Sequence, residues 1–222
     1  DTSDTGPAMR LHAYVFARKD DAAAREETEA ALLTFVQGGP SPAGLMAACR
    51  SLSLIGGPDS IPALAALALK PETTDAARYA LERIPGPEAD RALVGALDKT
   101  AGDVRRGVVF SLGARKSAAA VLALARLATG KDAAIAADAV KALGKIGGAE
   151  AVKALGTAFG RAPAGLKPEI ASALLAAAES AAVAGDKAAA TAVYDKVFAA
   201  NVSPVSRQAA FKGRIAAGPD PR

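Results

Sequence analysis

The sequence contains few aromatic side chains and few side chains that bind metals. Among its 222 residues there is no Trp, and there are three Tyr, six Phe, one His and one Cys. Because sheets pack through aromatic and β-branched residues, this composition argues against an all-β fold. Because the chain has only one His and one Cys, it cannot form the zinc, iron–sulfur and haem sites that need two or more such ligands. We therefore expect no metal and no cofactor.

Long apolar runs are also missing, since charges, Gly or Pro interrupt every Ala-rich segment before 18 residues are reached. Nothing is therefore expected to insert into a membrane. The net charge is +4, but the sequence lacks the dense Lys/Arg blocks of a nucleic-acid-binding arm. This charge favours an acidic partner only weakly. The first residue is Asp, so we expect a processed chain or an excerpt of a longer protein.

What the sequence does have is alanine, which supplies 59 of the residues and is the best helix former. Four segments, 52–67, 81–97, 112–127 and 143–159, align with one another. Two leucine columns recur at intervals of 29, 31 and 31 residues: Leu52, Leu81, Leu112 and Leu143, and then Leu64, Leu93, Leu124 and Leu155. A period of about 30 residues indicates stacked supersecondary units, because one unit alone cannot bury its apolar face.

Each unit is predicted to be two helices with a short break between them. In the fourth unit the first helix is expected over about 132–145, and Gly147 ends it by adopting the left-handed conformation. Gly56 and Gly86 occupy the equivalent breaks, and Ser117 is expected to cap the second helix of the third unit.

The fourth unit carries the motif Ala139-Val140-Lys141-Ala142-Leu143-Gly144-Lys145-Ile146-Gly147-Gly148. Partial copies lie at 77–84 and 108–113, and the chain resembles HEAT repeats of the short bacterial type over about 41–161. The resemblance implies an all-α fold, a right-handed α-α superhelix of about six to seven helix pairs. It also implies an interaction scaffold, and it favours an exported or periplasmic location over a cytoplasmic one.

We expect residues 1–222 to form one α-solenoid domain in three parts. Residues 1–40 would be a divergent N-terminal cap that includes a helix over 22–37, and 41–162 would hold the four HEAT-like repeats. Residues 163–222 would form divergent C-terminal helices.

Helical periodicity divides each second helix into a buried side and an exposed side. In the fourth unit the core side is expected to hold Val152, Leu155, Gly156, Ala158 and Phe159. The exposed side of the second helices and their ends carries a set of cations: Lys70, Arg91, Lys99, Arg126, Lys153 and Arg161. The resemblance places second helices on the concave face, where these side chains could recognise an acidic segment. Lys and Arg also solubilise exposed helix faces, and that explanation is the more common one for helical surfaces.

The sequence lacks the residues and motifs that common enzyme mechanisms need. The single His12 has no second His to pair with, and neither a G-x-S-x-G turn nor a phosphate-binding loop occurs. Cys49 lies among apolar residues and is expected to be a buried core residue. Among catalytic proteins with similar repeats, iron-dependent hydroxylases use paired His-Glu motifs and DNA glycosylases rely on Trp, which this chain lacks. Bilin lyases with similar repeats stay open as an alternative, although no residue of this sequence favours them.

The sequence therefore predicts a non-catalytic scaffold that binds a partner protein or an attached domain along the concave face. The alternative, from another class, is sequence-independent nucleic-acid binding through the same cations. A purely structural spacer is a third possibility.

Overall fold

A computed structural model describes residues 6–218, and its regular structure in that range is entirely helical. Thirteen α-helices and three 3-10 turns follow one another without a strand over these residues, which confirms the all-α fold class. The chain divides into two compact units, 1–111 and 112–222, and the boundary in the sequence falls within α7 (Gly102–Ala114). The outermost parts of the predicted terminal segments, 1–5 and 219–222, lie outside the described residues.

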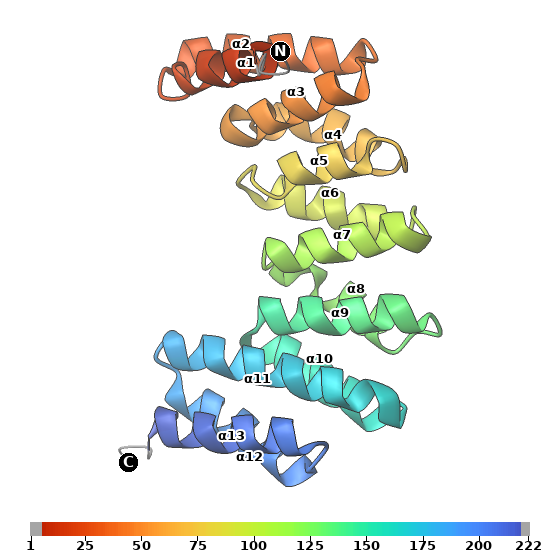
Figure 1. The fold of residues 1–222 in the computed structure, drawn as a ribbon, viewed down its shortest axis with the longest axis vertical. Coiled ribbons are helices and arrows are strands. Elements are labelled where there is room, and N and C mark those ends of the chain that lie inside the picture. The colour runs from red at the N-terminus through yellow and green to blue at the C-terminus, as the bar shows by residue number, and fades with distance from the viewer. Residues whose placement is uncertain (1–5, 219–222) are drawn as a thin grey trace. The chain divides into compact units, whose positions relative to one another are not determined.

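The first unit stacks helix pairs in chain order (Figure 1). First helices pack on first helices, as α1 does on α3 and α3 on α5, and the second helices α2, α4 and α6 pack in the same order. The bounds of these helices are α1 (Gly6–Phe16), α2 (Ala22–Gln37), α3 (Pro42–Ile55), α4 (Ile61–Ala68), α5 (Thr74–Leu81) and α6 (Pro87–Leu97).

The second unit repeats this arrangement. The first helix α9 packs on α11, the second helix α8 packs on α10, and α11, α12 and α13 contact one another. The bounds are α8 (Val121–Ala128), α9 (Ala133–Ile146), α10 (Gly148–Arg161), α11 (Lys167–Val183), α12 (Lys187–Ala200) and α13 (Pro204–Ala217). Single 3-10 turns lead into α4, α8 and α11: Pro58–Ser60, Ala118–Ala120 and Ala164–Leu166.

Both predicted leucine columns form the core of the pairs. Every member has no exposed surface: Leu52, Leu81, Leu112, Leu143, Leu64, Leu93, Leu124 and Leu155. Full burial of a Leu side chain contributes roughly 1.5–3 kcal/mol. The repeat found in the sequence is therefore the repeat of the core.

Glycine lets the first helices of the second unit approach one another closely. A Cβ added at Gly113 of α7 would lie 2.9 Å from the Cα of Ala142 in α9. One repeat later, a Cβ at Gly144 of α9 would lie 2.9 Å from the Cα of Ala173 in α11. Because backbone atoms cannot give way as a flexible side chain can, both positions require a residue without a Cβ at this helix separation.

The breaks within the pairs follow the predicted turn chemistry at two of the four positions. Gly147 and Gly86 have φ values of 65° and 99°, the conformation that only glycine adopts readily. The prediction is wrong at Gly56, which has φ −61° and instead leaves no room for a Cβ, since that atom would lie 2.5 Å from the carbonyl oxygen of Leu52. It is also wrong at Ser117, whose buried hydroxyl makes no cap hydrogen bond, because a 3-10 turn precedes α8.

Polar side chains join neighbouring pairs in the first unit. Glu29 of α2 reaches the break between α3 and α4, where its carboxylate accepts hydrogen bonds from the Gly57 amide (2.8 Å) and the buried Ser60 hydroxyl (2.5 Å). Arg78 of α5 donates to the carbonyl of Gly107 and to the Ser111 hydroxyl in α7, each at 3.0 Å. These contacts span one repeat length, so they fix the register of one pair on the next.

Candidate functional site

The six predicted cations, which we call the second-helix cations, all have exposed side chains. In the first unit Lys70 follows α4, Arg91 lies in α6 and Lys99 follows α6. In the second unit Arg126 lies in α8, and Lys153 and Arg161 lie in the neighbouring α10. Each unit thus carries three of them on adjacent second helices.

Most of the second-helix cations have no partner within the chain. Arg91 pairs with Glu88 one turn earlier, at 2.5 Å. Within residues 6–218, the side chains of the other five make no hydrogen bond or ion pair: Lys70, Lys99, Arg126, Lys153 and Arg161. Their charges are free to meet an external anion without first breaking an internal pair.

Three cations on the first helices, Arg78, Arg106 and Lys141, differ in this respect. Arg78 pairs with Asp75 at 2.5 Å and lies 3.8 Å from the carboxylate of Glu82. Arg106 pairs with Asp103 at 3.3 Å, and Lys141 of α9 lies 4.0 Å from Asp138 in the same helix. Pairing one turn apart satisfies these charges locally, since residues three or four apart share a helix face.

One of the second-helix cations also lines a cavity. A cavity of about 570 Å³ lies in the second unit, where the turn between α8 and α9 meets the turn between α10 and α11. Arg161 and Lys131 contribute cations to its lining, and Glu169 contributes a carboxylate. Lys131 was not among the predicted residues; it lies in the turn just before the helix that was expected over about 132–145.

The rotation of α10 differs from the predicted one. Leu155 and Ala158 are buried, as expected, but Val152, Gly156 and Phe159 are only half-buried. The core instead takes Ala151, one turn before Leu155. Two lysines of neighbouring helices cover the half-buried residues, Lys196 over Gly156 and Lys167 over the Phe159 ring at 5.4 Å.

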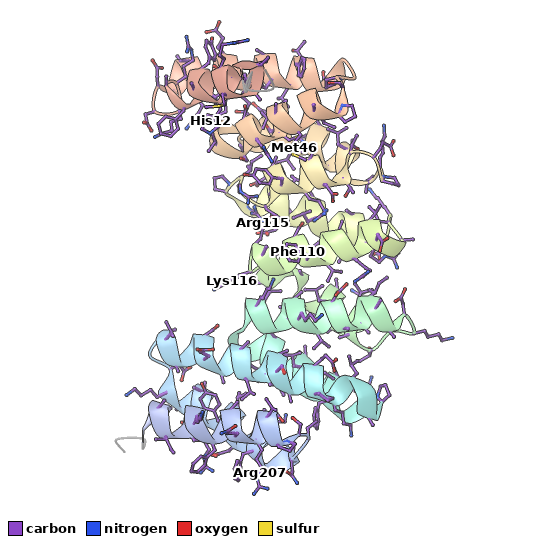
Figure 2. The ribbon with its side chains drawn as sticks, viewed as in Figure 1. His12, Met46, Phe110, Arg115, Lys116 and Arg207 are labelled. Atoms are coloured by element: carbon purple, nitrogen blue, oxygen red, sulfur yellow. The ribbon has the colours of Figure 1, made fainter. Side chains whose placement is uncertain are left out.

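The residues that could support catalysis or bind a metal are isolated. His12 is exposed on α1 (Figure 2). It stacks on Phe16, with ring centroids 6.2 Å apart. Cys49 has no exposed surface, and burial raises the pKa of its thiol to about 11. Over residues 6–218, no group of three or more His, Cys, Asp or Glu could hold a metal ion. Nor does that part of the chain contain a helix long and apolar enough to cross a membrane.

Stacked two-helix units with aligned leucine columns define an all-α helical-repeat protein of the solenoid class. A family model described as HEAT repeats matches residues 90–175, so the chain contains HEAT repeats. No curated protein is similar enough in sequence to match it. HEAT repeats generally serve as scaffolds for protein interactions, and solenoids of this kind are typically non-catalytic.

Proposed function

We propose that this HEAT-repeat chain is a protein-binding scaffold that holds an acidic segment of a partner protein, or of an attached domain, against its second-helix cations. The observation that carries the proposal is the contrast in pairing. Five of the six second-helix cations are exposed and unpaired within residues 6–218, whereas Arg78, Arg106 and Lys141 on the first helices are paired.

Small residues beside the cations support this assignment. Ala66, Gly95 and Thr157 lie on the exposed sides of α4, α6 and α10, so a partner backbone could approach these helices closely. A preformed helix face also costs little ordering entropy on binding. In the second unit, the cavity beside Arg161 could receive one acidic side chain of the partner.

The test uses a fluorescent oligoglutamate peptide and follows its anisotropy at about 50 mM salt, where surface ion pairs are least screened. The variant carries Arg126→Glu, Lys153→Glu and Arg161→Glu together. Each exposed ion pair contributes about 0.2–1 kcal/mol, so we expect the reversal of three charges to weaken binding roughly ten-fold or more.

The matched control reverses three exposed cations outside the proposed face, with Arg10→Glu, Lys187→Glu and Lys212→Glu. Both variants change the net charge equally, so they differ only in where the reversed charges lie on the protein. Equal weakening by the two variants, or no peptide binding at all, would refute the proposal. Tighter binding of single-stranded oligothymidine, with log affinity falling linearly with log salt, would replace it with the nucleic-acid alternative.

A further inference from the structure

Exposed large apolar side chains are concentrated on three helices of the chain. Within residues 6–218, four of the eleven such side chains lie in α1 and α2 and three lie in α13, whereas the other helices share four. Single exposed apolar residues need no explanation, but a cluster of them marks an interaction surface. The members of the two clusters are Met9, Tyr14, Phe16 and Phe35 in α1 and α2, and Val205, Phe211 and Ile215 in α13.

The first cluster includes two walls of a groove between α1 and α2. The groove has a volume of about 320 Å³, and most of its lining is apolar, with Leu11, Tyr14, Ala31, Leu32 and Phe35. Leu32 is buried, whereas Tyr14 is 50% and Phe35 49% exposed. Two half-exposed aromatic side chains therefore flank an apolar floor.

A single carboxylate supplies the charge in the lining of this groove. Glu27 is exposed, and within residues 6–218 it makes no hydrogen bond or ion pair. Thr28, the other polar residue of the lining, donates its hydroxyl to a backbone carbonyl of α2 at 2.6 Å. Of the nearby arginines, Arg18 lies over the Tyr14 ring, 3.4 Å from its centroid, and Arg10 is outside the lining. The groove thus offers an apolar surface beside an unpaired negative charge.

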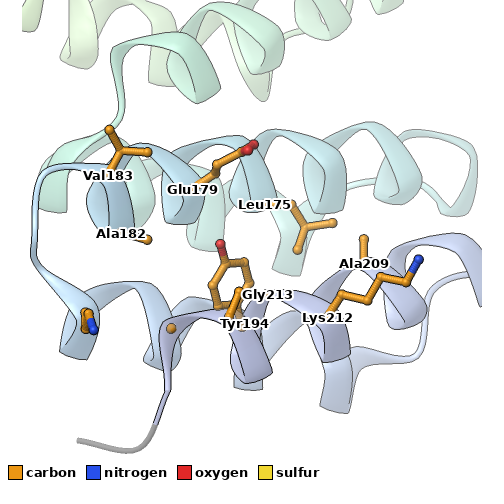
Figure 3. A pocket seen from close by; sticks show the side chains of 11 residues that line it. Leu175, Glu179, Ala182, Val183, Tyr194, Ala209, Lys212 and Gly213 are labelled. Atoms are coloured by element: carbon orange, nitrogen blue, oxygen red, sulfur yellow. The ribbon is translucent and has the colours of Figure 1, made fainter.

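α13 packs through small residues and exposes large ones. Its buried residues are Ser206, Ala210 and Ala217. On the same face Gly213 lies so close to the Tyr194 ring that an added Cβ would overlap the ring carbons (Figure 3). Phe211 and Ile215 lie on the other side of the helix and are 50% and 65% exposed. Since the Phe211 ring is 6.2 Å from that of Phe198 in α12, the outer face of α13 presents an apolar patch.

The charges of α13 are opposite in sign to the charge of the groove. The helix contains no Asp or Glu, and its three cations, Arg207, Lys212 and Arg214, are exposed. Arg214 pairs with Asp195 of α12 at 2.6 Å, but over the described residues Arg207 and Lys212 make no ion pair. Electrostatic complementarity therefore favours contact between α13 and the groove, whereas two α13 faces would repel each other.

We propose that copies of this chain associate head to tail, with the outer face of α13 of one copy docked in the groove between α1 and α2 of the next. Phe211 and Ile215 cover the apolar groove, and Lys212 pairs with Glu27. The chain matches itself here, because its second apolar cluster carries cations and its first lies beside a carboxylate. Since the two surfaces differ, the contact is heterologous and can repeat beyond a dimer. It uses none of the second-helix cations, so it is separate from the site proposed for the acidic segment.

Sedimentation velocity from micromolar to millimolar concentration tests this contact, and wild type should sediment as larger species as its concentration rises. Ala31→Arg, at an exposed position of the lining, fills the groove and adds a charge of the same sign as α13. Phe211→Gln combined with Ile215→Gln removes the apolar patch. Each variant loses the burial of large apolar side chains, so each should weaken self-association roughly ten-fold or more.

Mixing these two variants distinguishes a head-to-tail contact from general adhesion. Each variant keeps one intact surface, so an equimolar mixture should form a dimer that grows no further. The pairing of charges is tested by Glu27→Lys and Lys212→Glu, which should each weaken association and should restore it when combined in one chain.

The matched control, Leu122→Gln with Val183→Gln, removes two exposed apolar side chains outside both surfaces and should associate as wild type does. Circular dichroism establishes that each variant is folded. The proposal is overturned if wild type stays monomeric over the whole range, or if the control weakens association as much as the variants do. It is also overturned if the mixture forms no dimer, or if the combined charge variant does not recover.

Discussion

Gly144 shows how tightly the first helices of the second unit pack, and Gly144→Ala tests that packing. Ala normally stabilises a helix interior by about 1 kcal/mol relative to Gly. At Gly144, however, the new methyl would lie 2.9 Å from both the Cα and the Cβ of Ala173 and 3.0 Å from its carbonyl oxygen. Since α11 would have to move, overpacking costs about 1–3 kcal/mol. We therefore expect Gly144→Ala to lower the free energy of unfolding by about 0–2 kcal/mol, whereas helix propensity alone predicts an increase.

The control is Gly160→Ala in α10, where an added Cβ meets nothing within 4 Å. Propensity should act alone there and stabilise the protein by about 0.5–1 kcal/mol. Urea unfolding followed by circular dichroism gives the unfolding midpoint of each variant. If the dependence of the unfolding free energy on urea concentration is unchanged, the variants differ in stability alone and not in the surface exposed on unfolding.

A double-mutant cycle sharpens this test: in the background of Ala173→Gly, Gly144→Ala should cost less than it does alone, by the part of the clash that the Ala173 methyl causes. If Gly144→Ala is as stable as Gly160→Ala, the close helix approach does not constrain the fold and the reasoning is wrong.

Two further predictions concern Glu29 and Cys49 of the first unit. Glu29→Ala removes the acceptor for the Gly57 amide and the Ser60 hydroxyl and should cost about 1–3 kcal/mol in urea unfolding, whereas Glu26→Ala, exposed on the same helix, should change stability by less than about 0.5 kcal/mol. A negligible loss for Glu29→Ala would show that water replaces the carboxylate. Because burial raises the pKa of Cys49 to about 11, the thiol ionises in the unfolded chain near pH 9 but not in the folded one, so stability should fall between pH 9 and 11. Cys49→Ala should make that fall shallower by up to about 1.4 kcal/mol per pH unit, and parallel pH profiles would contradict the assignment.

Local chemistry made much of the fold predictable. Asp132 was expected at the start of a helix, and it caps α9 by accepting hydrogen bonds from the amides of Ala134 and Ile135 at 3.0 Å. Gly147 was expected to end that helix, and it does so with a positive φ. Both results depend on a few neighbouring residues, so sequence pattern suffices to predict them.

The candidate site was predictable only in part. The exposure of Arg126 and Lys153 follows from helical period alone. The pairing of Arg91 with Glu88 follows a spacing of three residues that sequence can suggest, whereas the lack of partners of Arg126 and Lys153 depends on side-chain rotamers that no pattern encodes. Lys131 escaped prediction because its place beside Arg161 results from two turns that lie a full repeat apart in sequence.

By itself, the sequence determined that this protein is an all-α stack of two-helix units, because a period of about 30 residues in leucine and alanine can bury its apolar faces only by stacking. It also excluded metal sites that require several His or Cys ligands, since one of each is present. The tertiary structure decided where helices approach without room for a Cβ, and which two turns of the second unit come together around Arg161 and Lys131. Those features depend on the spacing between helices that are distant in sequence, and this spacing is set by packing rather than by local preference.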